Sequence, residues 1–273
     1  MIEEYWGLKE KPFSNTPDTR FLYRTGEFEE ALARLLYNIK EIGGGLTVIT
    51  GEIGSGKTFL AFALMEKLKE EGYPVALITN PTFSPTGLLR EMAYSFGLEK
   101  VPRYRMQILK LLREFLEKNG KVGVLIIDEA QILKPSLLEE IRLLLNLETP
   151  KTKLLQIVLF GQPELKKKIN RMPQVRQRIN VRYHLGPMDE EETEGYILHR
   201  LKVAGCTRRI FTVDAIKEIH RYSGGIPRVV NNLAQNALFV GYVQEKNEID
   251  AEIIKDVAAD LEMEEEERRR KGR

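Results

Sequence analysis

The segment GEIGSGKT (51–58) has the residue types and the spacing of a phosphate-binding loop. It fits the pattern G-x-x-x-x-G-K-[ST] and lies between an apolar strand-like run and an amphipathic segment typical of a helix. The glycines allow backbone N–H groups to wrap a phosphate chain, and the helix N-terminus adds its dipole. The Lys57 ammonium would reach the β- and γ-phosphates, and the Thr58 hydroxyl would ligate Mg²⁺. We expect the nucleotide contacts to come from Gly51, Glu52, Ile53, Gly54, Ser55, Gly56, Lys57, Thr58 and Phe59.

A second chemical element, VLIIDEA (124–130), places two acids directly after four apolar residues. A strand in a buried parallel sheet would deliver Asp128 to the carboxyl edge, where α/β sheets bind ligands. Asp128 is there a candidate for the Mg²⁺ shell. Glu129 is a candidate for the group that orients or deprotonates an attacking water. The alternative is an acid pair that begins the next helix, but the nucleotide loop upstream favours the catalytic interpretation.

Two further polar residues follow apolar segments in positions suited to sensing a phosphate. Gln162 in FGQPEL (160–165) comes directly after a predicted strand, where it could sense the γ-phosphate or hold a water. The alternative is a turn-forming Gly-Gln-Pro. Arg228 in GGIPRVVNNL (224–233) begins a predicted helix, where a cation opposes the helix dipole unless an anionic ligand is present. The alternative for Arg228 is a solvated arginine.

The stretch PQVRQRINVR (173–182) contains Arg176, Arg178 and Arg182 and no acid. Lys166, Lys167, Lys168 and Arg171 precede it. Such a cluster would bind nucleic acid phosphates with affinity that falls steeply with salt, or one arginine would contact a phosphate on a neighbouring subunit. A solvated helix face is the plainer interpretation of the lysine triplet.

The elements that must position these residues alternate between strand and helix. Apolar runs at 46–50, 74–80, 122–128 and 153–161 predict four buried strands, and the segments between them predict helices at 55–72, 85–97, 103–119 and 135–148. An amphipathic helix at 26–42 precedes the first strand. Continuous apolar strands alternating with helices indicate an α/β fold with a parallel sheet covered on both faces.

The pattern after residue 187 consists of helices only, at 190–204, 213–222, 227–242 and 249–261. Asp189 with Glu192 forms a capping-box signature at the first of them. We therefore expect a nucleotide-binding base domain at 1–187, with an aromatic arm at 1–25 packed on it. An all-helical lid at 188–262 and a charged tail at 263–273 complete the prediction.

Composition limits the remaining options only weakly. The net charge of +2 among 273 residues means that any nucleic-acid binding must come from a local patch. Cys206 is the single cysteine, which suits a reducing cytosol. The sequence shows no signal peptide and no apolar run long enough to span a membrane.

The motifs as a set resemble those of AAA+ ATPases: the phosphate loop, the DE strand, the arginine-rich segment and the GxPR helix. The resemblance is closer to the ATPase domain of the general secretion pathway protein A (ExeA-like) group, which is similar to ATP-dependent regulators of DNA transposition. It covers residues 1 to 260 and rests on WGLKEKPFSNTPDTRFLY, ITGEIGSGKT, FGQPEL, RQRI, ILHRLKVAG and GGIPRVVNNL.

The resemblance implies a P-loop AAA+ αβα sandwich with a C-terminal helical lid, ATP and Mg²⁺ as cofactors, and a ring or filament homo-oligomer such as a hexamer. It implies that Arg228 acts as sensor 2 and that Arg178, or else Arg176, is the finger that reaches the neighbour's γ-phosphate. Phe13 or Tyr23 would lie near the adenine. Gln162 departs from the Asn or Thr found at sensor 1 in many relatives.

The resemblance also implies that ATP hydrolysis powers a bacterial secretion or pilus machine through an assembly protein at the inner membrane. Secretion members of the group usually continue into a membrane span, whereas this sequence stops at Arg273. Its last residues, RRRKGR, resemble the basic flank found on the cytoplasmic side of such a span. We expect a cytoplasmic protein, either tethered by a segment beyond residue 273 or a shorter soluble relative. The alternatives are a DNA-binding ATPase of the transposition-regulator type, for which the lysine triplet argues, and a nucleotide switch with little turnover, against which Glu129 argues.

Overall fold

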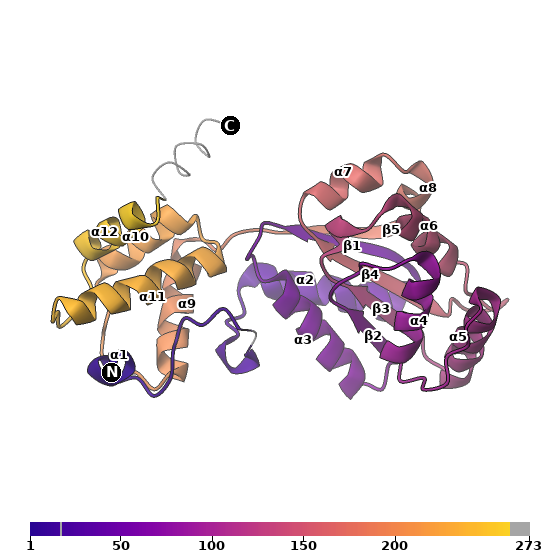
Figure 1. Ribbon diagram of the computed structural model, residues 1–273, viewed down its shortest axis with the longest axis horizontal. Coiled ribbons are helices and arrows are strands. Elements are labelled where there is room, and N and C mark those ends of the chain that lie inside the picture. Colours follow the sequence, from indigo (N-terminus) through magenta and orange to yellow (C-terminus); the bar gives the residue numbers. More distant parts are fainter. Residues whose placement is uncertain (17, 263–273) are drawn as a thin grey trace. The chain divides into compact units, whose positions relative to one another are not determined.

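The computed structural model describes residues 1–16 and 18–262, so the predicted charged tail at 263–273 lies outside the described residues (Figure 1). The chain divides into two compact units. The sheet unit comprises Gly26–Glu52 and Gly56–Leu185. The helical unit comprises Met1–Thr25, Ile53–Ser55 and the chain from Gly186.

The sheet unit is built on a parallel sheet of five strands within the described residues, in the order β2-β3-β4-β1-β5. Every residue of β3 and β4 is buried, because neither strand lies at an edge and helices cover both faces. The parallel sheet and the α/β class predicted from the sequence are therefore confirmed. The strands are β1 (Gly45–Gly51), β2 (Val75–Ile78), β3 (Gly123–Ile127), β4 (Leu155–Gly161) and β5 (Ile179–Leu185).

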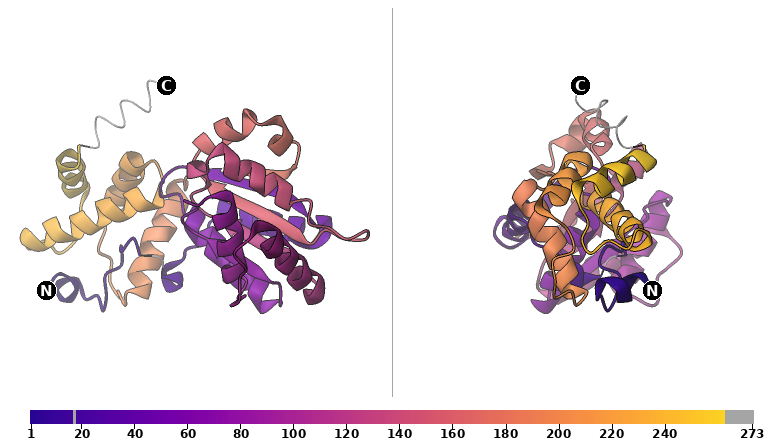
Figure 2. Two further views of the ribbon diagram at one scale, coloured as in Figure 1. Left: turned by 45° about the vertical axis from the view of Figure 1, so that its right-hand side comes forward. Right: turned by 90° about the vertical axis from the view of Figure 1, so that its left-hand side faces the viewer.

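Helices pack on the two faces of this sheet (Figures 1 and 2). One face contributes alternate strand residues such as Val48, Leu125 and Ile157 to a core shared with α4 (Pro85–Ser95), α5 (Arg105–Asn119) and α6 (Pro135–Leu144). This alternation follows from the period of two in a strand, which sends successive side chains to opposite faces. Two further helices, α2 (Gly26–Tyr37) and α3 (Lys57–Glu70), contact each other. Of these, α2 also packs against β5, and α3 packs against β1, β2 and β4.

The structure adds a fifth strand that the sequence analysis did not predict. β5 follows two short helices, α7 (Glu164–Asn170) and α8 (Pro173–Arg176), and pairs in parallel with β1. Its side chains alternate between half-buried residues, such as Val181 and Tyr183, and exposed polar ones, such as Arg182 and His184. This pattern is typical of an edge strand with one solvated face, and its polar residues, among them Arg182, obscured the periodicity.

The helical unit contains the four predicted helices, and their starts follow the predicted caps. Asp189 and Glu192 form both hydrogen bonds of a capping box at the start of α9. The Thr212 side chain accepts a hydrogen bond from the Ala215 N–H at the start of α10. The bounds are α9 (Glu190–Val203), α10 (Val213–Ser223), α11 (Pro227–Val243) and α12 (Ala251–Asp260).

The aromatic arm packs in the helical unit and not on the sheet domain, which differs from the sequence prediction. Trp6 is fully buried, and its Nε1–H donates to the Leu238 carbonyl of α11 at 2.9 Å. Phe13 is 2% exposed and packs edge-to-face against Phe211, with 6.1 Å between ring centroids. The aromatic content of the arm correctly indicates burial, but burial alone does not specify which core receives the rings.

A buried arginine fixes the turn of the arm. Arg200 of α9 is 3% exposed and donates from Nε to the Pro12 carbonyl at 2.6 Å and from Nη2 to the Ser14 carbonyl at 2.8 Å. Its Nη1 donates to the Tyr196 hydroxyl at 2.8 Å. A buried cation requires such partners because its desolvation is otherwise costly.

Among the described residues, no helix is long and apolar enough to cross a bilayer.

Candidate nucleotide and metal site

The loop between β1 and α3 is shaped by glycines and closed by its lysine. Gly54 and Gly56 have φ angles of 83° and 96°, which lie in the left-handed region that favours glycine. Lys57 is 7% exposed, and its Nζ donates to the carbonyl oxygens of Gly51 at 3.0 Å and Glu52 at 2.7 Å. The ammonium therefore lies inside the loop, as expected for a group that meets phosphate there.

The other loop residues predicted to contact nucleotide lie at the start of α3 or in the loop itself. Ser55 is buried, whereas Glu52 and Ile53 are exposed. Phe59 is half-buried in the first turn of α3. Their predicted contacts with a nucleotide stay predictions.

Asp128 lies at the carboxyl end of β3, and a hydrogen bond joins it to the phosphate-loop helix. The Thr58 Oγ1–H of α3 donates to Asp128 Oδ2 at 2.6 Å, and the Glu129 N–H donates to Oδ1 at 2.9 Å. Asp128 is only 3% exposed. Burial raises the pKa of its carboxyl above the ordinary value, and the two hydrogen bonds oppose this shift.

The Thr58 hydroxyl and the Asp128 carboxylate have the oxygen chemistry that a magnesium ion requires. Mg²⁺ prefers oxygen ligands and commonly uses one or two protein groups together with substrate phosphates. A buried carboxylate with a raised pKa would also gain from a neighbouring cation, which favours the ionised form. Within residues 1–16 and 18–262, no group of three or more His, Cys, Asp or Glu side chains could hold a metal by itself. Thr58 and Asp128 are therefore the candidate protein ligands of an ion shared with the nucleotide.

Glu129 has an unusual backbone conformation beside this pair. Its φ is 52°, in the left-handed region that non-glycine residues rarely adopt, and its side chain is exposed. Such strain is found at functional sites, where surrounding structure maintains it. The Glu129 Oε2 accepts a hydrogen bond from the Gln131 Nε2–H. The sequence analysis did not single out Gln131.

Gln162 follows β4, which pairs directly with β3 in the sheet. The carboxyl ends of these two strands are therefore neighbours, so Asp128 and Gln162 follow adjacent strand ends. The Gln162 N–H donates to the Gln131 Oε1 at 3.1 Å. The role of the Gln162 side chain as a phosphate sensor stays a prediction.

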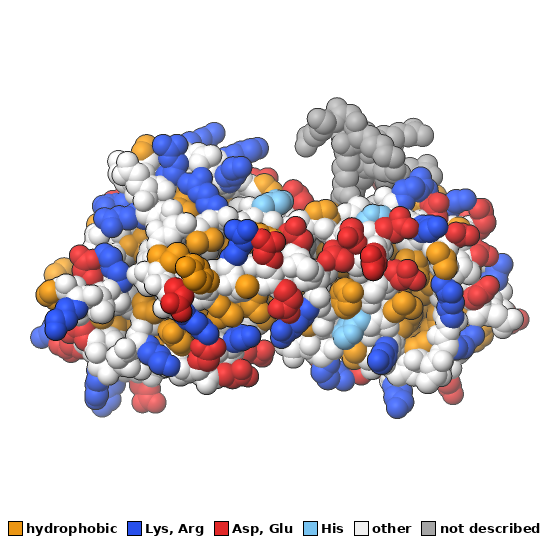
Figure 3. Space-filling view, turned by 180° about the vertical axis from the view of Figure 1, so that it is seen from behind, with side chains coloured by type: hydrophobic (Ala, Val, Ile, Leu, Met, Phe, Trp, Pro, Cys, Tyr) orange, Lys and Arg blue, Asp and Glu red, His pale blue; other side chains and the backbone are white. Residues whose placement is uncertain are grey.

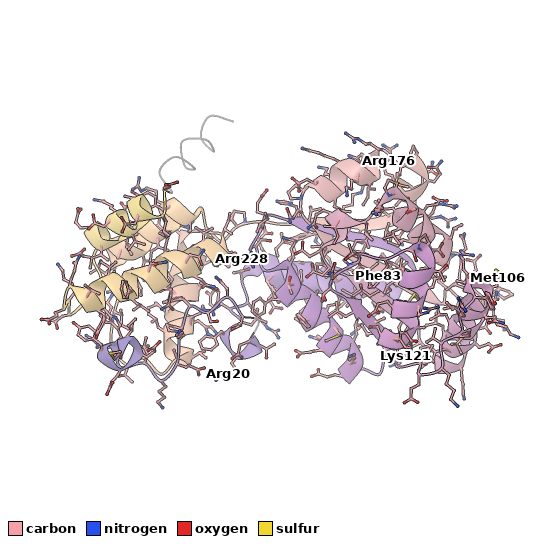
Figure 4. All side chains as sticks on the ribbon, in the orientation of Figure 1. Arg20, Phe83, Met106, Lys121, Arg176 and Arg228 are labelled. Atoms are coloured by element: carbon pink, nitrogen blue, oxygen red, sulfur yellow. The ribbon has the colours of Figure 1, made fainter. Side chains whose placement is uncertain are left out.

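The two candidate finger arginines lie on the surface of the sheet unit. Arg176 ends α8 (Figure 4), and Arg178 lies directly before β5. Both are exposed, and the Arg178 Nη2 donates to Asn146 Oδ1 at 3.1 Å. The Arg178 carbonyl accepts from the Leu46 N–H of β1 at 3.0 Å, which anchors its backbone to the sheet.

The lysine triplet that precedes these arginines is not uniform. Lys166 and Lys167 are exposed, whereas Lys168 is half-buried and donates from Nζ to the carbonyl oxygens of Gln131 and Leu133. A single basic face predicted from the sequence is therefore split into two exposed lysines and one that binds backbone.

Arg228 lies in the first turn of α11 in the helical unit, and its side chain is exposed (Figure 4). Within that unit, its backbone N–H donates to the Gly54 carbonyl at 3.3 Å. The predicted contact of its guanidinium with nucleotide stays a prediction. So does the adenine contact of Tyr23, whose ring lies 6.3 Å from that of Tyr196.

Comparisons with known proteins support the resemblance to AAA+ ATPases. Residues 41–169 match the family model of an AAA domain. The general secretion pathway protein A of Aeromonas hydrophila is 40% identical over 255 residues, which are 91% of this chain and 46% of that protein. The chain thus spans about half the length of this relative.

Solved structures show the same fold at low sequence identity. Cdc6p from Pyrobaculum aerophilum matches with a TM-score of 0.71 and 18% identity, covering 91% of this chain and 70% of that chain. The ADP form of the Aeropyrum pernix ORC2 protein matches with a TM-score of 0.69 and 18% identity, covering 92% and 73% respectively.

The raised pKa of Asp128 predicts a stability that depends on pH. Folding favours the protonated form of this carboxyl, so the ionised form opposes folding at neutral pH, and the penalty vanishes as pH falls below the ordinary Asp value. We expect Asp128→Asn to raise the melting temperature at pH 7 without nucleotide or Mg²⁺, and the gain to shrink as pH falls toward the ordinary Asp pKa.

Glu52→Gln is the matched control, because it removes an exposed carboxylate from the same site. Thermal unfolding followed by circular dichroism measures both variants. A gain for Asp128→Asn that is absent at pH 7, or that grows on acidification, would contradict the assignment of burial as the dominant cause.

Proposed function

Taking as premise that this chain is an AAA+ ATPase of the general secretion pathway protein A type, we propose Mg²⁺-dependent ATP hydrolysis by an oligomer of the chain. The work done would be assembly or transport in a bacterial secretion or pilus machine, through an assembly protein at the cytoplasmic side of the inner membrane. The hydrogen bond between Thr58 and Asp128 is the observation that supports this proposal most directly. It joins the phosphate loop to a carboxylate at the carboxyl edge of the sheet.

Each of the candidate site residues has a separate task in this proposal. The loop N–H groups and the Lys57 ammonium would bind the phosphates, and Thr58 with Asp128 would hold the metal. Bound Mg²⁺ would neutralise negative charge on the phosphates. Glu129 would accept a proton from the attacking water at its carboxylate, and Gln162 would orient that water or contact the γ-phosphate.

Two arginines would complete the site in an oligomer. The exposed side chain and anchored backbone of Arg178 suit a finger that reaches the γ-phosphate bound by a neighbouring copy, with Arg176 as the second candidate. Arg228 would contact nucleotide as sensor 2 from the lid. The similarity to a secretion protein over 91% of the chain supports the proposed cellular role.

Substitutions in the loop and at the catalytic carboxylate should separate binding from turnover. We expect Lys57→Ala to lose nucleotide binding, because the phosphates lose their buried ammonium. Glu129→Gln should bind ATP with wild-type affinity but hydrolyse it at least ~100-fold more slowly, the usual scale of general-base catalysis. Fluorescent-nucleotide titration and phosphate release measure the two quantities.

Glu114→Gln, which replaces an exposed carboxylate on α5, is the control for the charge change. Wild-type turnover by Glu129→Gln would rule out the proposed role of this carboxylate.

The finger arginine should act between subunits. We expect Arg178→Ala to bind ATP normally and to lose turnover by roughly 10³-fold, the scale of a finger's contribution. Mixing it with Lys57→Ala, which does not bind ATP but still has Arg178, should restore activity where mixed oligomers form. Phosphate release in titrated mixtures measures this recovery. The absence of recovery in mixtures whose hetero-oligomers are verified by mass photometry would contradict action in trans.

A second candidate function is DNA-dependent ATP hydrolysis of the transposition-regulator type. Exposed cations cover α7 and α8, as Figure 3 shows at its upper left. These side chains could neutralise DNA phosphates without reading sequence. They are Lys166, Lys167, Arg171 and Arg176.

The ATPase rate at low salt, measured with and without double-stranded DNA across protein concentrations, distinguishes the two functions. For the secretion-type ATPase we expect a specific rate that rises with protein concentration and does not respond to DNA. Strong stimulation by DNA that is lost in Lys166→Glu/Lys167→Glu, and that falls steeply with salt, would favour the DNA-dependent function instead.

A further inference from the structure

Gln131 links two segments of the site through a single side-chain amide. Its Nε2 donates to the Glu129 carboxylate, and its Oε1 accepts the Gln162 N–H at 3.1 Å. An amide group has a donor end and an acceptor end on opposite sides. The donor end here binds the candidate general base after β3, and the acceptor end binds the backbone that follows β4.

The end of β4 is shaped to admit Gln131. A Cβ atom on Gly161 would lie 3.1 Å from the Gln131 Oε1 and 3.2 Å from the Gln131 backbone N. It would also lie 2.9 Å from Cδ2 of Leu165. A larger residue at position 161 would therefore crowd the Gln131 amide and Leu165, so the close approach favours glycine.

The helix that follows β4 holds the backbone of the same residue. Lys168 of α7 donates from Nζ to the Gln131 carbonyl and, at 3.2 Å, to the Leu133 carbonyl. Gln131 lies in the short 3₁₀ helix Ala130–Ile132, and Leu133 follows that helix directly. The position of Gln131 is thus set by β4 through its side chain and by α7 through its backbone.

The Glu129 side chain needs such support. An exposed glutamate loses substantial rotamer freedom when it is held in one orientation. Its φ of 52° lies outside the conformations of regular helices and strands. The hydrogen bond from Gln131 is the side-chain contact that the described residues provide for its carboxylate.

We propose that Gln131 is a positioning residue for ATP hydrolysis: it orients the Glu129 carboxylate relative to the end of β4, with Lys168 of α7 holding it in place. This inference rests on the proposed function of Glu129 as the group that activates water. Because α7 leads through α8 to Arg178, a displacement of α7 by a neighbouring subunit would reach Glu129 through two hydrogen-bonded residues.

The test replaces the amide by an apolar side chain of similar length. We expect Gln131→Met to lower kcat by about 10- to 100-fold, a loss within the usual contribution of a positioned general base. The KM and the ATP dissociation constant should change less than about 3-fold, because binding groups are untouched. Gln107→Met, at an exposed position of α5, is the matched control and should hydrolyse ATP at the wild-type rate.

A double substitution shows whether Gln131 acts through Glu129. In the Glu129→Gln background, adding Gln131→Met should lower the residual rate no further, since residues that act as a unit are non-additive. An equal fold-loss in both backgrounds, or wild-type turnover by Gln131→Met, would overturn the inference. Wild-type turnover by Glu129→Gln alone would instead reject the proposed function, so the two failures are distinguishable.

The lysine provides an independent measurement should Gln131→Met fail to fold. Lys168→Arg keeps a donor for the two carbonyl oxygens and should keep kcat within about 3-fold, whereas Lys168→Met should lower kcat with KM unchanged. Equal kcat values for the two Lys168 variants would contradict the inference.

Discussion

The buried carboxylate of Asp128 is the constraint on which the site depends. A carboxylate at 3% exposure is tolerated only if its oxygens are bonded, and the bonds come from the first turn of α3 and from the next backbone N–H. The strand order β3-β4-β1 makes this possible, because the ends of β1 and β3 then lie one strand apart. The loop after β1, the acids after β3 and Gln162 after β4 consequently converge at one edge of the sheet.

The sequence predicted those parts of the fold whose signals are local. Four buried apolar strands, the phosphate loop and the capped helices after residue 187 follow from periodicity and cap chemistry within short windows. Strand β5 does not, because Asn180 and Arg182 interrupt its apolar pattern and, with Arg178 before it, suggest a charged loop. The packing of the arm was also inaccessible, since a buried Trp6 is compatible with either core.

The candidate site shows the same division. Lys57, Thr58 and Asp128 belong to motifs with fixed spacing, so their proximity could be predicted. The role of Gln131 could not, because Gln162 follows a different strand and only the fold brings the two residues within hydrogen-bonding distance. The three consecutive lysines look equivalent in the sequence, yet the helical period turns Lys168 toward backbone carbonyls and leaves the other two in solvent.

The packing of the arm has a consequence for the order in which the protein acquires its structure on the ribosome. Residues 1–25 are made before the sheet unit, whereas their partners in α9 and α11 are made only after it. At ~5–20 residues per second, the interval is on the order of ten seconds. Trp6, Phe13 and Phe21, each at most 5% exposed in the finished protein, have no native surface to cover them during that time. During that interval the aromatic segment lacks the core that buries it in the folded protein.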